Sequence, residues 1–285
     1  MEWRRLGLGI LTQRPVAELR AAFARTGLFA LDLDECVFPG FSQAALGTRV
    51  LRHVLREPAR AGDRRFLPKL LFGGLYFAFT EARRFLGAPT PARRLFAWYD
   101  RVMRGIPEPY FRAAAQRLPR RSYPLAAETI ELLAGHAPTG LVTLGLDVVA
   151  QAYLEQLRSA ERPSLTFFDS NVMLFRPDAR GESCCAGYDH ERLMADGAAK
   201  RRALERRLAT HGAAVASVVG HGDADVPMAR LARETGGLAI GFCPPQRLWD
   251  AFDAVVADRS WELMYALVAI LEGAAKAMAA PAAFL

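Results

Sequence analysis

The chain has 285 residues, of which 52% are hydrophobic and 24% charged, a composition that excludes an intrinsically disordered protein. Its formal net charge is +7 and is carried almost wholly by arginine, because lysine occurs only at Lys69, Lys200 and Lys276. A basic surface attracts nucleic acid, anionic lipid or small phosphorylated molecules without choosing among them. No Cys/His spacing typical of a zinc site is present.

The N-terminal segment Met1–Leu11 has too short an apolar run for a secretion signal, and the four cysteines show no disulfide framework. We therefore expect a cytoplasmic protein. The longest apolar region, Phe66–Phe79, is interrupted by Pro68 and Lys69 and is shorter than the roughly 20 residues that span a bilayer. Its flanking arginines leave peripheral membrane contact as the less favoured alternative to packing within the protein.

The first buried strand predicted by the sequence is Leu28–Leu31, which leads directly into Asp32, with Asp34 two residues later. In an extended chain both carboxylates point to one side, and the turn signal Pro39-Gly40 follows. Because open α/β sheets place their sites at the carboxyl ends of strands, the pair can serve as nucleophile and as general acid–base. The alternative is that both residues only cap a turn.

From Phe41 to about Arg121 the apolar residues recur with helical spacing, and almost nothing predicts a buried strand. After Pro124, strands and helices alternate. The expected strands are Gly140–Gly145, Ser164–Phe168, Ala214–Gly220, Gly237–Phe242 and Ala254–Val256. The expected helices are Leu125–Ala134, Asp147–Leu157, Ala199–Thr210 and Trp261–Leu271. This alternation predicts an α/β fold with a doubly wound parallel sheet and an early all-helical insertion.

Two of these later elements carry candidate phosphate-binding groups. Thr143 lies at the end of a predicted strand, two residues before Gly145, and its hydroxyl can donate a hydrogen bond to a phosphate oxygen, although threonine is also an ordinary strand residue. Lys200 opens a predicted helix in a chain that otherwise uses arginine, which indicates a need for a compact ammonium group. The alternative is a solvated lysine.

The loop Gly220–Met228 ends another predicted buried strand in glycines and two carboxylates, Asp223 and Asp225, and then enters a helix. Such a loop is suited to hold a hard cation beside a phosphate.

The order of these motifs resembles the haloacid dehalogenase (HAD) superfamily: Asp-x-Asp after the first strand, a threonine after a later strand, a lone lysine opening a helix, and a Gly/Asp loop ending in Pro-Met. The resemblance extends from Leu28 to about Asp258 and is strongest to the phosphoserine phosphatase-like branch, whose helical cap lies between the first two motifs. Gly105 and the hairpin-like segment Asn171–Gly187 are also similar. It implies a HAD-like Rossmannoid core of residues 1–40 and 123–285 with a helical cap of residues 41–122.

The resemblance also implies an activity, that of a metal-dependent phosphomonoesterase acting on a small organic phosphate. Asp32 would be the nucleophile and form an aspartyl-phosphate, and Asp34 would protonate the leaving alkoxide and then activate water. Thr143, Gly145 and Lys200 would hold the phosphoryl oxygens. Dehalogenases of the superfamily lack the second acid, so Asp34 favours phosphate esters over carbon–halogen chemistry.

The metal implied is Mg²⁺, or Mn²⁺ or another divalent ion, bound by Asp32, Asp34 and Asp225. The family pattern Gly-Asp-Gly-x-Asn-Asp-x-Pro-Met places His221 where the first aspartate, normally a metal ligand, should stand. Three explanations stay open: Asp223 reaches the cation, His221 binds a softer metal such as Mn²⁺, or metal binding is weak.

We expect a small phosphorylated substrate, no nucleic acid partner, and a monomer or homodimer. L-phosphoserine is disfavoured because Val37–Leu46 contains no acidic residue to meet its ammonium group. The alternative function is a catalytically weak or inactive HAD-fold protein that binds a phosphorylated ligand or a partner protein, and the feature that favours it is His221.

Overall fold

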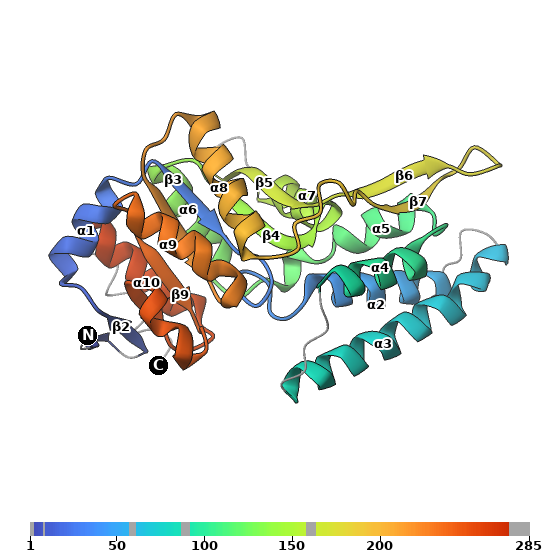
Figure 1. The fold of residues 1–285 in the computed structure, drawn as a ribbon, viewed down its shortest axis with the longest axis horizontal. Coiled ribbons are helices and arrows are strands. Elements are labelled where there is room, and N and C mark those ends of the chain that lie inside the picture. The colour runs from blue at the N-terminus through green and yellow to red at the C-terminus, as the bar shows by residue number, and fades with distance from the viewer. Residues whose placement is uncertain (1–2, 8, 57–60, 87–91, 158–163, 274–285) are drawn as a thin grey trace.

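The protein is described here by a computed structural model that covers residues 3–7, 9–56, 61–86, 92–157 and 164–273. Its centre is an eight-stranded sheet (Figure 1). In spatial order the strands are β1 (Arg4–Gly7), β2 (Ile10–Thr12), β10 (Ala254–Val256), β9 (Ala239–Phe242), β8 (Ala216–Gly220), β3 (Leu28–Leu31), β4 (Thr139–Leu146) and β5 (Leu165–Asn171).

All strands from β10 to β5 in this order run parallel, which confirms the predicted doubly wound parallel sheet. The sheet is mixed at one edge, because β2 pairs antiparallel with β10 and β1 pairs antiparallel with β2. The sequence did not predict these two strands. β1 is Arg-Arg-Leu-Gly and mostly exposed, so this edge lacks the apolar run by which the central strands were predicted.

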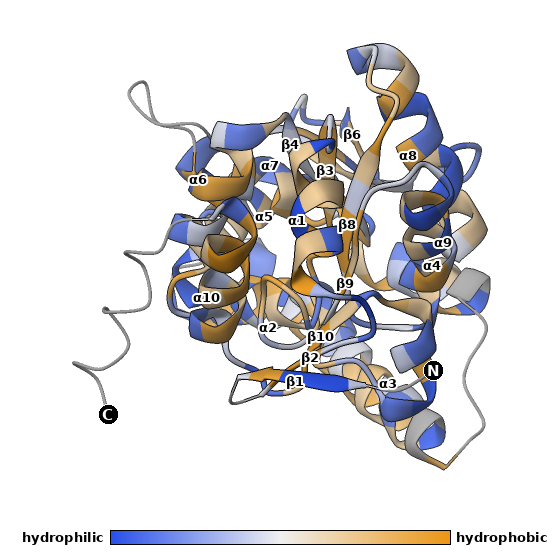
Figure 2. Cartoon of the chain, turned by 90° about the vertical axis from the view of Figure 1, so that its left-hand side faces the viewer, coloured by the Kyte–Doolittle hydropathy of each residue, from blue (hydrophilic) through white to orange (hydrophobic). Residues whose placement is uncertain are grey.

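Helices cover both faces of the sheet, as Figure 2 shows. On one face lie α1 (Val16–Ala24), α6 (Ala126–His136) and α10 (Trp261–Glu272). On the other lie α8 (Gly197–His211) and α9 (Val226–Glu234), whereas α7 (Asp147–Gln156) packs against β5. Each predicted core helix is therefore present, with ends shifted by at most a few residues, as expected for frayed termini.

The central strand β3 explains why its sequence is apolar without alternation. Phe29 and Leu31 belong to the apolar core that includes α1, α6 and α10, whereas Leu28 and Ala30 belong to the core under α8 and α9. Successive side chains of a strand point to opposite faces, so a strand covered on both sides needs apolar residues at every position.

The described residues between β3 and β4 form helices joined by turns and contain no named strand, as predicted. It contains α2 (Ser42–Arg56), α3 (Leu67–Phe85), α4 (Ala92–Met103) and α5 (Glu108–Ala115). We refer to these four helices as the cap. In α2 the residues Leu46, Val50 and Val54 are fully buried at four-residue spacing, which fixes the face that this helix turns inward.

One face of α3 is apolar and exposed. Leu71, Phe72, Leu75 and Phe79 are between 55% and 70% exposed, whereas Leu70 on the opposite face is buried. The predicted aromatic packing within the cap is present at Tyr76, whose ring lies 4.3 Å from that of Trp98. None of the described helices combines the length and hydropathy that a membrane crossing requires.

A separate antiparallel hairpin, β6 (Met173–Pro177) and β7 (Ser183–Tyr188), leaves the sheet after β5 and packs on the cap (Figure 1). The amide of Gly105 donates to the carbonyl of Cys185 at 2.7 Å, and the amide of Cys185 donates to the carbonyl of Ile106 at 2.8 Å. A Cβ on Gly187, whose φ is +119°, would lie 2.2 Å from Oδ1 of Asp100, so this contact requires glycine. The hairpin expected from Asn171–Gly187 is thus confirmed.

Candidate active site

Three segments that are distant in sequence bring Asp32, Lys200 and Asp225 together beside the end of β3. The ammonium nitrogen of Lys200 donates to Oδ1 of Asp32 and to Oδ1 of Asp225, both at 2.6 Å. Lys200 is only 2% exposed, Asp32 7% and Asp225 1%. A solvated lysine is therefore excluded, and Asp32 does more than cap a turn.

The cluster holds two carboxylates and one cation, so burial acts on a net negative charge. Burial and the neighbouring charge of Asp225 raise the pKa of Asp32 to about 7, although Lys200 opposes the shift. Burial also disfavours ionised Asp225, but Lys200 and the amides of Gly222 and His221 outweigh it and lower the pKa of Asp225. Lys200 stays charged, because both carboxylates raise its pKa. A further positive charge would be stabilised here.

Asp34 is held by the first residue of the cap. The backbone amide of Ser42 donates to Oδ1 of Asp34 at 2.8 Å. Burial raises the pKa of Asp34 while this hydrogen bond opposes the shift. Between Asp34 and Ser42 the chain makes a tight turn. In this turn the amides of Val37 and Phe38 both donate to the carbonyl of Leu33. The orientation of Asp34 is thus coupled to the start of α2.

Thr143 lies near the end of β4 and is 1% exposed. Its Oγ1 accepts a hydrogen bond from the amide of Gly145 at 3.0 Å, which leaves its own hydroxyl proton to be donated elsewhere. The amide of Gly145 is occupied by this bond. A Cβ on Gly145 would lie 3.1 Å from Thr143 Oγ1 and 3.3 Å from Ser42 Oγ. Because glycine has no Cβ, it leaves space beside these two hydroxyls.

Ser42 also contributes to the site, although no sequence motif predicted it. Its buried hydroxyl lies beside the Asp34 carboxylate and lowers the pKa of that carboxyl. Its neighbour Gln43 donates to the carbonyl of Leu144 at 3.1 Å, and Asn171 donates to the same carbonyl at 2.8 Å. The signal that could have found Ser42 is its place as the first polar residue after the turn that follows Asp34.

The structure places His221 and Asp223 differently from Asp225. The ring Nδ1 of His221 lies 3.3 Å from the carbonyl oxygen of Phe242. Asp223 forms a two-point ion pair with Arg247, at 2.5 Å for each contact, and this partner lowers the pKa of the Asp223 carboxyl. The side chain of Asp223 is about two-thirds exposed (67%), so its charge is already satisfied at the surface.

The carboxylates and the imidazole near Asp32 are the candidate ligands of a divalent cation. No three of the side-chain ligand atoms of Asp32, Asp34, Asp223, Asp225 and His221 lie within 4.8 Å of one another. Mg²⁺ is usually bound by one or two carboxylates and completes its octahedron with water and substrate oxygens. Asp32 and Asp225 lie together on Lys200 and offer carboxylate oxygens, the ligand type that Mg²⁺ prefers, so the chemistry of these residues fits Mg²⁺.

No protein-family model matches the chain. No curated protein matches it in sequence either. Among solved structures the chain is similar to a HAD family hydrolase from Salmonella enterica serovar Typhi, at 16% identity over 85% of this chain and 71% of that one, with a TM-score of 0.59.

Two further solved structures resemble most of the chain. A substrate-bound phosphoserine phosphatase shares 17% identity over 84% of this chain and 96% of its own, with a TM-score of 0.59. The cytosolic 5′-nucleotidase IIIB bound to cytidine shares 14% identity over 94% of both chains, with a TM-score of 0.62. The chain has the HAD fold. In this HAD fold the helical cap between β3 and β4 corresponds to the insertion that the sequence motifs implied, so the predicted resemblance and fold class are confirmed.

Proposed function

We propose that the protein is a metal-dependent phosphomonoesterase that hydrolyses a small organic phosphate through an aspartyl-phosphate on Asp32. The observation that carries this proposal is the buried contact of Lys200 with both Asp32 and Asp225 at 2.6 Å. It fixes one oxygen of the nucleophile and leaves the other for attack. Phosphoryl transfer depends mainly on such positioning and on electrostatic stabilisation of the transferred group.

In the first half-reaction, Asp32 attacks phosphorus, the ester P–O bond breaks, and Asp34 gives its proton to the departing alcohol oxygen. In the second, Asp34 removes a proton from water as the water attacks the phosphoryl group on Asp32, which releases inorganic phosphate and restores both carboxyls. Burial raises the pKa of Asp34, which favours the protonated form that a general acid needs.

Lys200 and the hydroxyl of Thr143 hold the phosphoryl oxygens, and the hydroxyl of Ser42 lies near that of Thr143 as a further candidate donor. A divalent cation, Mg²⁺ or another such as Mn²⁺, would be held by Asp32, Asp225 and the carbonyl of Asp34. When bound, it supplies positive charge that offsets the charges of the phosphate and the carboxylates. His221 and Asp223 are the remaining candidate ligands, and the ion pair of Asp223 with Arg247 favours His221 of the two.

The alternative function is a HAD-fold protein that binds a phosphorylated ligand without turning it over. The substitution of His221 for a metal-binding aspartate favours it. The cytoplasmic location and the monomeric or homodimeric state stay predictions.

Hydrolysis of p-nitrophenyl phosphate, with Mg²⁺, Mn²⁺, Co²⁺ or EDTA, tests the proposal in three proteins: wild type, Asp32→Asn and Asp250→Asn. Asp250 is a surface carboxylate whose side chain accepts a hydrogen bond from Gln13 and forms no ion pair among the described residues, so it controls for loss of a charge. We expect turnover that EDTA abolishes, that Asp250→Asn retains, and that Asp32→Asn lowers at least about 10⁴-fold. Full activity of Asp32→Asn would contradict the mechanism. Absence of turnover by folded wild type, with every metal and a panel of natural phosphate esters, would favour the alternative.

A further inference from the structure

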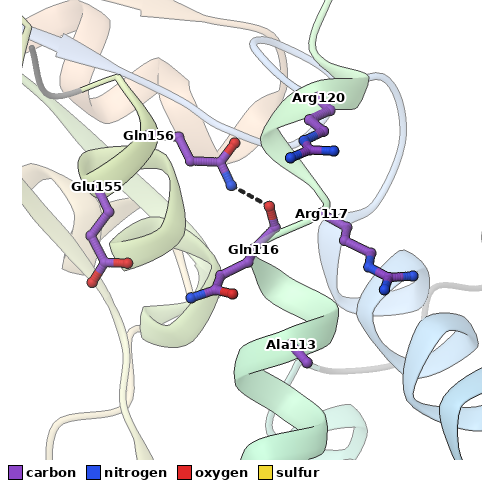
Figure 3. Close-up of a pocket in the computed structure, with 6 residues that line it drawn as sticks. All are labelled: Ala113, Gln116, Arg117, Arg120, Glu155 and Gln156. Atoms are coloured by element: carbon purple, nitrogen blue, oxygen red, sulfur yellow. Dashed lines mark hydrogen bonds between the residues drawn. The ribbon is translucent and has the colours of Figure 1, made fainter. Parts of the chain in front are cut away.

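The cap carries a basic pocket outside the cluster of Asp32, Lys200 and Asp225. Four of its lining residues come from the second half of α2, and one follows α5. They are Arg49, Arg52, His53, Arg56 and Arg117. We call this set the basic pocket. Arg117 also lines a neighbouring cavity between the end of α5 and α7, which Figure 3 shows with Arg120 on the same side.

The arginines of the basic pocket lack the carboxylate partners that arginines have elsewhere. Arg207 pairs with Asp169 at 2.6 Å, and Arg201 pairs with Glu234 at 2.7 Å. By contrast, the arginines of the basic pocket form no ion pair with any carboxylate in the described part of the chain. Among the described residues, the pocket therefore gathers several positive charges that no carboxylate pairs directly, and the nearest one shown is Glu155, across the neighbouring cavity that Arg117 also lines.

This gathering of like charges is unfavourable without a ligand. Burial and the charges of Arg121, Arg117 and Arg52 lower the pKa of Arg49. The Nε atom of Arg49 is buried and has no hydrogen-bond acceptor among the described residues. A buried donor without an acceptor costs free energy, and so does each close like-charge pair. One oxyanion in the pocket would remove both costs.

The basic pocket lies close to the candidate active site. Ser42, whose amide holds Asp34, begins α2, and Arg49 follows seven residues later, on the same helix face and roughly 10 Å further along the axis. The charge of Arg121, whose guanidinium lies 5.4 Å from the ring of Phe38 in the turn after Asp34, also acts on Arg49.

We infer that the basic pocket binds an oxyanion of the phosphate or carboxylate class, at a site separate from Asp32 and Lys200. Planar guanidinium groups pair with such anions through two parallel hydrogen bonds, and several arginines together favour a multiply charged one. The oxyanion is either a second anionic group of the substrate, which rests on the proposed function, or a separate polyanion. Both sources share this chemistry.

Isothermal titration calorimetry with inorganic pyrophosphate, at fixed ionic strength and in EDTA, tests the site without using turnover. EDTA keeps metal away from the cluster of Asp32 and Asp225, whose net negative charge then repels the probe. We expect saturable binding by wild type and at least about tenfold weaker binding by Arg49→Gln/Arg117→Gln. The control Arg176→Gln/Arg206→Gln removes the same charge from exposed residues outside the pocket and should bind as wild type does.

Absence of saturable binding by wild type would overturn the inference, as would equal weakening in the control. Circular dichroism checks that each variant is folded. If Arg49→Gln/Arg117→Gln does not fold, Arg52→Gln/Arg56→Gln, at exposed positions of the same pocket, takes its place with the same expected loss.

Kinetics of the holoenzyme then distinguish the two sources. If the pocket holds part of the substrate, the pocket variant raises KM for a hexose bisphosphate at least about tenfold and leaves KM for p-nitrophenyl phosphate unchanged. If the anion is a separate ligand, both KM values stay at the wild-type level while pyrophosphate binding is lost. Because calorimetry needs no turnover, failure of the proposed phosphatase activity would leave the binding result intact.

Discussion

Charges are arranged in opposite ways at the edge of the sheet and on the cap. In the core, Lys200 lies between Asp32 and Asp225, and all three are buried and bonded to one another. On the cap, the basic pocket gathers arginines that no described carboxylate pairs directly, and α3 exposes a row of apolar side chains.

The difference separates two kinds of cost. The buried charges of the core are compensated within the chain, so they cost stability only if one member is removed. The charges and apolar residues of the cap are uncompensated as they stand, so a binding partner would stabilise them. The core thus holds its charges in mutual contact, whereas the cap exposes charged and apolar side chains among the described residues.

The largest expected effect is that of removing the cation from the core. Lys200→Met leaves two buried carboxylates facing each other, and we expect the free energy of unfolding to fall by about 3 to 5 kcal/mol, with loss of turnover. Urea denaturation measures the change. The control Lys69→Met removes an exposed lysine of α3 and should stay within about 0.5 kcal/mol of wild type. A stable Lys200→Met protein would mean that the core charges are not mutually dependent.

Two arginine variants should change the free energy of unfolding by an intermediate amount, and in opposite directions. Arg207→Gln removes the ion pair with Asp169 and a hydrogen bond to the carbonyl of Phe168, so we expect a loss of about 1 to 2 kcal/mol in unfolding free energy. Arg49→Gln relieves repulsion, so we expect a gain of about 0.5 kcal/mol at low salt that disappears in roughly 1 M salt. Thermal or urea unfolding at two salt concentrations checks both signs. Equal destabilisation by the two changes would refute the contrast.

The smallest effect is expected on the exposed face of α3. Leu75 is 70% exposed, so Leu75→Gln should change the free energy of unfolding by less than about 0.5 kcal/mol. Leu46→Ala, at a fully buried position of α2, should cost about 2 to 5 kcal/mol and serves as the matched comparison. A large loss for Leu75→Gln that grows with protein concentration would show that a second copy covers this face.

Most of the core could be predicted because the central strands are largely apolar and helices alternate with them, as a parallel sheet requires. The antiparallel edge could not, since β1 is Arg-Arg-Leu-Gly and mostly exposed, and so lacks the apolar run of a buried strand. The exposure of the apolar face of α3 could not be predicted either, because the sequence does not show which neighbour covers an apolar residue.

The positions of Asp32, Asp34, Thr143 and Lys200 could be predicted because each lies where a buried element ends or begins. The contacts among them could not be read from spacing. Ser42 was missed because its role depends on the turn that returns the chain to Asp34, and the ion pair of Asp223 with Arg247 depends on a segment 24 residues away.

The hairpin of β6 and β7 has a consequence for synthesis of the chain. Its strands follow β5 in sequence, yet they pack on α4 and α5, which were made about 70 to 90 residues earlier. The amide of Tyr188 bonds to Asp100, 88 residues before it. During translation the cap therefore cannot complete its contacts until residue 188 has left the ribosome. Cap helices that emerge first must wait with apolar surface uncovered, which makes this interval the one in which the nascent chain is most open to aggregation and to chaperones.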